Sequence, residues 1–338
     1  MRRGGYDLAA AWRSLARGWH EFFHEPLDTR ACAIVRIAYA AVVLVHWAVL
    51  YPDLERWFGE SGVLPGAVSR ESEIAGPHQW SLLWLLPATP AVLQACFCIA
   101  VGHTVLLGVG LLPRLNAACL LAWLISFQSR NGLILDGEDT TMRLLALYLV
   151  LMPCGASWSL NAMILRWSRT WANPHPSPLP EGEGTTPLAP AWGLRLLQIQ
   201  VAAIFLTAGL EKLASDAWLD GTAMYYVARL DDYFGRFPTP TWLFDSRWSV
   251  ACITWLVILG ELLVPVFVWF RQTRRWALLA AVLFHLANEW TMHLFLFHWL
   301  MLVGWLSFLD PSDWQWLARV PGTGNKGQEN QRMMDNAS

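Results

Sequence analysis

Long apolar runs, separated by short charged segments, constrain this 338-residue chain more than any other feature. A helix needs roughly 20 mostly apolar residues to cross a bilayer. Windows of about that length, the last two being short, lie at 31–51, 90–112, 115–135, 140–158, 192–213, 248–270, 275–293 and 296–310. Only 15% of the residues are charged, against about 25% in a soluble domain. We therefore expect an all-α, polytopic membrane bundle of about eight transmembrane helices.

The distribution of arginine and lysine predicts the orientation of these spans. The N-terminal segment, the connections after the second, fourth and sixth spans, and the C-terminal tail are basic, whereas the connections after the first, third and fifth spans are acidic. Positively charged segments remain on the cytoplasmic side of a membrane. We expect a cytoplasmic N-terminal segment over 1–30, a transmembrane domain over 31–310 and a disordered cytoplasmic tail over 311–338. The expected location is a bacterial inner (plasma) membrane.

Two further segments stand apart from this pattern. A ninth apolar run, at about 79–87, is too short to cross a bilayer, and we expect it to be re-entrant or interfacial. The segment 173–190 contains six prolines, which are not tolerated in helix or strand interiors. It is predicted to be a flexible cytoplasmic linker that divides the spans into two groups of four.

The sequence excludes several classes of function. Net charge is −2 and neither terminus is a basic arm with interleaved aromatic residues, so no nucleic-acid partner is expected. No glycine-rich nucleotide-binding loop, GxSxG elbow or CxxCH motif occurs. These absences leave chemistry on membrane lipids or quinones as an open class.

Lys212 is the most informative charged residue within the apolar runs, because only two of the 24 basic residues are lysines. A lysine in apolar surroundings loses its charge more readily than an arginine and can act as a base. Glu211 points about 100° away from Lys212 on a helix. Asp216, at i+4, would be a local partner if the helix continued that far. Position alone favours a lysine that extends its ammonium to water at the outer membrane edge.

A second polar pattern lies near the C-terminus, where His285, Glu289 and His293 recur at intervals of four residues. This spacing predicts that the three side chains share one helix face. Such a face forms either a buried polar seam between helices or a metal site. The segment does not match HExxH, and no metal is predicted.

Turn residues combine with charges in two connections, 129–139 and 218–222, on the same predicted side of the membrane as Lys212. Asn-Gly and Asp-Gly pairs favour tight turns. Their acidic residues either cap helices or close a polar pocket over Lys212.

Several of these segments together resemble the vitamin K-dependent γ-carboxylase and HTTM (horizontally transferred transmembrane) family. The resemblance covers about residues 25–310. It rests on Ala208–Leu213 (AGLEKL), Trp218–Met224 (WLDGTAM), Arg130–Asn131, Gln200 and Phe284–Asn288 (FHLAN).

The resemblance implies that Lys212 is a catalytic base that deprotonates a reduced vitamin K or menaquinol-like quinol. Oxygenation of the quinol to an epoxide then generates a strong base, which removes a proton from a glutamate γ-carbon so that carbon dioxide adds, a carbon–carbon lyase activity. The implied partners are membrane lipid, the quinol and a protein or peptide substrate. The implied substrate and quinone pocket consists of Asn131, Gln200, His285, Asn288, Trp218 and Asp220.

Some positions depart from the carboxylase pattern. Gly132 stands where carboxylases carry a histidine, Phe205 replaces a tyrosine, and Glu211 replaces a second lysine. The large lumenal domain of the animal carboxylase is also not expected here. Two interpretations therefore stand side by side. One is a quinol-dependent oxygenase or carboxylase that uses Lys212, and the other is a non-catalytic lipid-binding or quinone-binding, transport or assembly protein that retains the fold.

Overall fold

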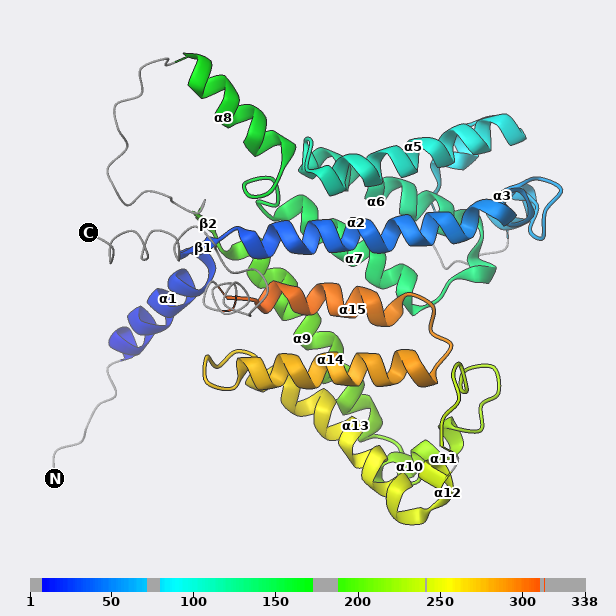
Figure 1. Cartoon of the computed structure of the whole chain (residues 1–338), viewed down its shortest axis with the longest axis vertical. Coiled ribbons are helices and arrows are strands. Elements are labelled where there is room, and N and C mark those ends of the chain that lie inside the picture. Colours follow the sequence, from blue (N-terminus) through cyan, green and yellow to red (C-terminus); the bar gives the residue numbers. More distant parts are fainter. Residues whose placement is uncertain (1–7, 72–79, 173–187, 241, 311–312, 314–338) are drawn as a thin grey trace, which may run out of the picture.

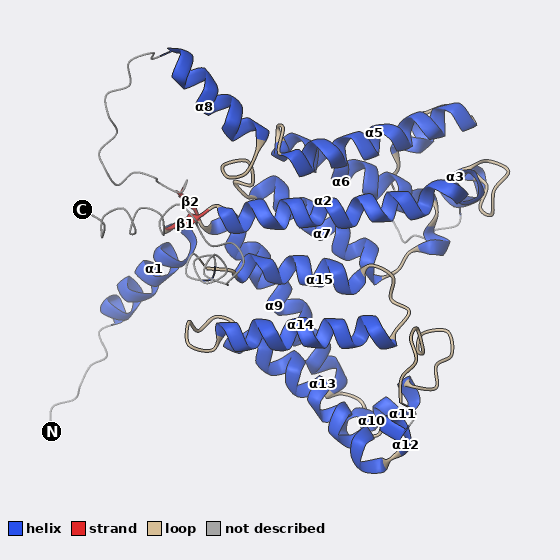
Figure 2. Ribbon diagram, in the orientation of Figure 1, coloured by secondary structure: helices blue, strands red, loops and turns tan. Residues whose placement is uncertain are grey.

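The computed structural model describes residues 8–71, 80–172, 188–240, 242–310 and 313, and within them it is almost entirely helical (Figure 2). Each predicted apolar window overlaps a helix. These helices are α2 (Arg30–Leu50), α5 (Pro90–Val109), α6 (Pro113–Arg130), α7 (Gly137–Leu151), α9 (Trp192–Lys212), α13 (Arg247–Phe267), α14 (Arg274–Thr291) and α15 (Phe297–Trp305). The prediction of an all-α fold is confirmed at this level.

Four of these helical segments are long and apolar enough to cross a membrane: Arg30–Phe58, Pro90–Val109, Trp192–Lys212 and Arg247–Phe267. The other four helices are shorter or carry more charged residues. Helix α15, for example, has only nine residues. The chain is therefore a membrane protein, and the total of about eight spans stays a prediction.

The helices run between two ends of the bundle (Figure 1). One end, called the α1 end, carries α1 (Leu8–His24), β1 (Pro26–Asp28), α8 (Leu160–Ala172), β2 (Leu188–Pro190) and η4 (Leu306–Phe308). The other, called the α3 end, carries η1 (Tyr51–Asp53), α3 (Leu54–Phe58), α4 (Gly66–Glu71), η2 (Leu82–Leu85), η3 (Gly132–Ile134), α10 (Asp216–Leu219), α11 (Ala223–Val227) and α12 (Trp242–Asp245). Because α9 begins at the α1 end, Lys212 lies at the α3 end.

The short segments differ in part from the prediction. Residues 173–187 of the expected linker and nearly all of the expected tail over 311–338 lie outside the described residues. The last three linker residues form β2, which pairs antiparallel with β1 so that Pro190 faces Pro26. The linker prediction is wrong there because proline, which lacks an N–H, is tolerated on the edges of such a two-stranded ladder. In the ninth apolar run, Leu82–Leu85 forms the 3-10 helix η2.

Buried polar contacts fix the helices against one another. Arg36 of α2 is fully buried and donates to the backbone carbonyls of Cys154 and Trp158 in the turn before α8. Tyr39 donates from its hydroxyl to the carbonyl of Met142 in α7 at 2.9 Å. Since a polar group in an apolar interior is costly without a partner, these bonds hold α2 in one position.

Candidate functional site

Lys212 reaches a neighbouring helix because a glycine one turn earlier lets α9 and α13 approach closely. A Cβ built on Gly209 would lie 2.8 Å from Cδ2 of Leu262 and 3.2 Å from Cβ of Glu261. Small residues permit this kind of close helix packing in membranes. The AGLEKL motif therefore contains both Gly209, at which α9 packs closely on α13, and Lys212, which follows three residues later.

Lys212 forms an ion pair with Glu261. Its Nζ lies 2.8 Å from each of the two carboxylate oxygens. The side chain of Glu261 is 8% exposed and that of Lys212 is 22% exposed. Nζ also lies 5.1 Å from the centre of the Trp218 ring in α10. The ammonium is thus held between a carboxylate and an aromatic face, both of which attract a cation.

The local partner considered for Lys212 does not form. Helix α9 ends at Lys212, and Asp216 begins the separate helix α10. The turn between them carries Trp218, rather than Asp216, to the ammonium. Glu261 was visible in the sequence as a carboxylate within an apolar run, and its need for a cation was the signal that could have identified it.

A second polar cluster surrounds His285, which is 1% exposed. Trp305 donates from its indole N–H to Nε2 of His285 at 3.3 Å, so the imidazole proton is assigned to Nδ1. Nδ1 lies 3.2 Å from Nδ1 of His298. The Phe205 ring packs 5.2 Å from the imidazole and 5.0 Å from the indole, between ring centres. His285 is therefore enclosed by aromatic rings.

These two clusters lie at different depths along α9. Phe205 precedes Lys212 by seven residues, which places the two on one helix face about 10 Å apart along the axis. Gln200 precedes Lys212 by twelve residues, or about 18 Å, and accepts a hydrogen bond from the hydroxyl of Tyr148 at 3.0 Å.

The remaining predicted pocket residues have other roles. Asn131 is fully buried, donates to the carbonyl of Trp57 at 2.8 Å and accepts from the N–H of Leu133 at 3.0 Å, so that it shapes the turn after α6. The Asn288 amide donates to the carbonyl of Phe284 in its own helix. Asp220 is exposed and ends α10. Of the six predicted pocket residues, only Trp218 is brought to Lys212.

The predicted polar face of His285, Glu289 and His293 is wrong, because α14 ends at Thr291. Glu289 pairs with Arg236 at 2.5 Å. The backbone N–H of His293 donates to the carbonyl of Tyr233 where the chain has left the helix. Within the described ranges, no group of three or more His, Cys, Asp or Glu side chains could hold a metal ion.

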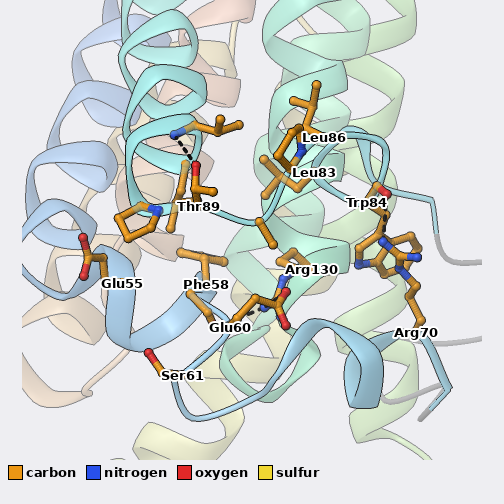
Figure 3. A pocket seen from close by; sticks show the side chains of 16 residues that line it. Glu55, Phe58, Glu60, Ser61, Arg70, Leu83, Trp84, Leu86, Thr89 and Arg130 are labelled. Atoms are coloured by element: carbon orange, nitrogen blue, oxygen red, sulfur yellow. Dashed lines mark hydrogen bonds and ion pairs between the residues drawn. The ribbon is translucent and has the colours of Figure 1, made fainter.

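A cavity of about 200 Å³ opens at the α3 end between η2, α3, α5 and α6 (Figure 3). Arg70 donates to the carbonyl of Trp84 at 2.8 Å and lies over its ring. Arg130 donates to two backbone carbonyls, and its guanidinium lies 3.7 Å from the Glu60 carboxylate. Both guanidiniums are thus engaged by the protein itself.

Comparison with known proteins places this arrangement in context. A family model described as the HTTM domain matches residues 78–314. The sporulation-delaying protein SdpB of Bacillus subtilis (strain 168) is 32% identical over 124 residues, which cover 35% of this chain and 38% of that protein. The uncharacterized protein YitO of the same strain is 28% identical over 193 residues, or 55% of each protein. The matches thus span only about a third to a half of these curated relatives. No solved structure matches the chain.

Proposed function

This chain belongs to the HTTM family, and we propose that its Lys212–Glu261 pair accepts a proton from a weakly acidic, lipid-soluble quinol. The observation that carries the proposal is the geometry of the pair, in which one Nζ lies 2.8 Å from both oxygens of a nearly buried carboxylate. The side chain of Lys212 is 22% exposed beside Trp218, which leaves the ammonium accessible to a ligand.

The pair supports proton acceptance because it has a neutral alternative. Transfer of one proton from Nζ of Lys212 to the carboxylate of Glu261 removes both charges, which a low-dielectric site favours more than water does. The amine then carries a lone pair and accepts a proton from the quinol hydroxyl, while Glu261 retains the first proton. The Trp218 ring stabilises the ammonium that results.

Two residues at the pair fit a quinol. Lys212 would bind the hydroxyl, and Trp218 offers an aromatic surface beside it. In the carboxylases that this chain resembles, a quinol supplies oxygenation chemistry that drives the addition of carbon dioxide to a glutamate of a protein or peptide. His285 and Asn131 are buried and engaged in the protein's own hydrogen bonds, so we assign them a supporting role.

A second candidate is a non-catalytic protein that binds, transports or helps to assemble a lipid or quinone. The aromatic contacts of Phe205 favour it, because a phenylalanine encloses His285 where carboxylases offer a tyrosine hydroxyl. In that case Lys212 would hold an acidic headgroup without accepting its proton.

We also propose that all eight helices cross a bacterial plasma membrane with the α1 end in the cytoplasm. The basic Arg271, Arg274 and Arg275 next to the turn between α13 and α14 support this orientation. In a background without native cysteines, Asp220→Cys should react with an impermeant maleimide from outside whole cells, and Arg271→Cys should be protected. The reverse pattern would overturn the orientation.

The function is tested with the full chain in nanodiscs supplied with reduced vitamin K or menaquinol, oxygen and labelled bicarbonate. Epoxide formation by the wild type but not by Lys212→Met supports the proposal, and incorporated label extends it to carboxylation. Arg229→Met is a matched control, because Arg229 forms an exposed ion pair with Asp245 at the same end. Quinol binding without turnover in any variant would favour the second candidate.

A further inference from the structure

A second cavity, of about 190 Å³, lies at the α3 end. The proposed function does not involve the residues that line it. It lies between the last turn of α2, α3, the end of α6, the first turn of α7 and the loop before α15. Its polar lining consists of His46, Gln128, Glu138 and Asp139. No lysine or arginine occurs among the described residues that line it.

Two nearly buried carboxylates lie beside this cavity. Glu138 is 9% exposed and Asp139 is 5% exposed. Asp139 accepts from the backbone N–H of Asp136 and from Nε2 of Gln128, while Glu138 accepts from the backbone N–H of Leu296. The N-terminus of α7 also stabilises carboxylates in its first turn. These N–H groups hold the carboxylates in place, and Arg143, which does not line the cavity, interacts electrostatically with Asp139.

An unpartnered acceptor independently points to a ligand. Gln128 lines the cavity and is 5% exposed. Its Nε2 donates to the Asp139 carboxylate at 2.8 Å, which fixes the orientation of the amide. Its Oε1 is buried and has no hydrogen-bond partner within the described part of the chain. A buried acceptor of this kind calls for a donor that the protein does not provide.

The apolar lining is suited to a cation. Trp57, Phe58, Phe127 and Phe295 contribute aromatic rings to the cavity. Aromatic faces attract ammonium groups, particularly where water is excluded. An uncharged hydroxyl would satisfy Gln128 but would lack the charge-assisted hydrogen bond that an ammonium makes to a carboxylate.

We propose that this cavity binds a primary ammonium group on a short apolar stem. The ammonium donates to Oε1 of Gln128 and to the carboxylate of Glu138, while the stem packs against the aromatic rings. The ammonium belongs either to the headgroup of an aminophospholipid such as phosphatidylethanolamine or to a free amine. This site is separate from the Lys212–Glu261 pair, so it stands or falls independently of the quinol proposal.

The test measures thermal stabilisation and affinity of the full chain in phosphatidylcholine nanodiscs titrated with n-hexylammonium chloride, with 1-hexanol as the uncharged probe. We expect hexylammonium to bind and hexanol to give no comparable shift. Glu138→Gln keeps a hydrogen-bond acceptor but removes the charge, and it should weaken hexylammonium binding about 30-fold. Glu55→Gln, on an exposed carboxylate of α3, should bind as the wild type does.

A second variant separates binding from folding. Leu135 also lines the cavity. Leu135→Trp fills the cavity while leaving Glu138 in place, and it should abolish binding in a protein that remains monodisperse and helical. Nanodiscs that contain phosphatidylethanolamine identify the source, because a lipid headgroup would compete with hexylammonium and a free-amine site would be unaffected. Equal shifts with hexanol, or full binding by both Glu138→Gln and Leu135→Trp, would overturn the proposal.

Discussion

The contact between Lys212 and Glu261 makes a quantitative prediction about stability. Replacing Lys212 by methionine leaves a carboxylate that is 8% exposed without its partner, and Glu261→Met leaves the ammonium unpaired. A single charge in an apolar helix costs roughly 2.5–3.5 kcal/mol on insertion scales. Because the remaining group can relax or neutralise, we expect each single variant to lose about 2 kcal/mol.

The double variant gives the decisive comparison. Two well-packed methionines remove both charges together, so the double variant should lose only about 1 kcal/mol. The coupling energy is then about 3 kcal/mol, at the upper end of the range for contacting residues. The free energy of unfolding of the wild type, the two single variants and the double variant is measured by circular dichroism in mixed micelles.

The exposed pair Arg229–Asp245 serves as the control cycle. Its side chains are 41% and 59% exposed, and its coupling should stay below about 1 kcal/mol. A coupling at Lys212–Glu261 no larger than about 0.5 kcal/mol would refute the reasoning.

Three further variants test the packing around the site by the same unfolding measurement. Gly209→Ala should destabilise the protein by about 1–3 kcal/mol relative to Gly102→Ala. A Cβ at Gly209 would meet Leu262, whereas a Cβ at Gly102 would have nothing within 4 Å. Equal effects of the two variants would argue against close packing of α9 on α13. Arg36→Met should cost about 3 kcal/mol by leaving buried carbonyls unsatisfied, and Arg36→Lys should rescue little, because lysine lacks the two-pronged donor. His285→Leu should cost about 1–3 kcal/mol by removing the acceptor of the Trp305 indole, and a stability equal to that of the wild type would contradict the assigned hydrogen bond.

The sequence predicts the helices better than it predicts their contacts. Hydropathy locates α2, α9 and the other apolar helices because burial in lipid demands long apolar runs whatever their neighbours are. It does not identify Glu261 as the partner of Lys212, since 49 residues separate them and the pairing depends on how α9 packs on α13. For the same reason, the sequence does not reveal that most of the polar residues of the resemblance lie away from Lys212.

Two local errors have local causes. The period of four from His285 to His293 assumes a continuous helix, but the chain leaves α14 after Thr291, where Met292 bridges to Phe234. The proline content of 173–190 argues against long regular structure, but it does not prevent the three residues of β2 from pairing with β1. Both patterns predict the type of a structural element better than the residue at which it ends.

The most direct test of the central claim is proton transfer from a quinol to the Lys212–Glu261 pair. Reduced menaquinol is titrated anaerobically into nanodiscs that contain the wild type or the Lys212→Met/Glu261→Met double variant, and ultraviolet absorbance follows the loss of the hydroxyl proton at neutral pH. The account predicts deprotonation by the wild type and intact, bound quinol in the double variant. Deprotonation of the same extent by both proteins, or by neither, would contradict it.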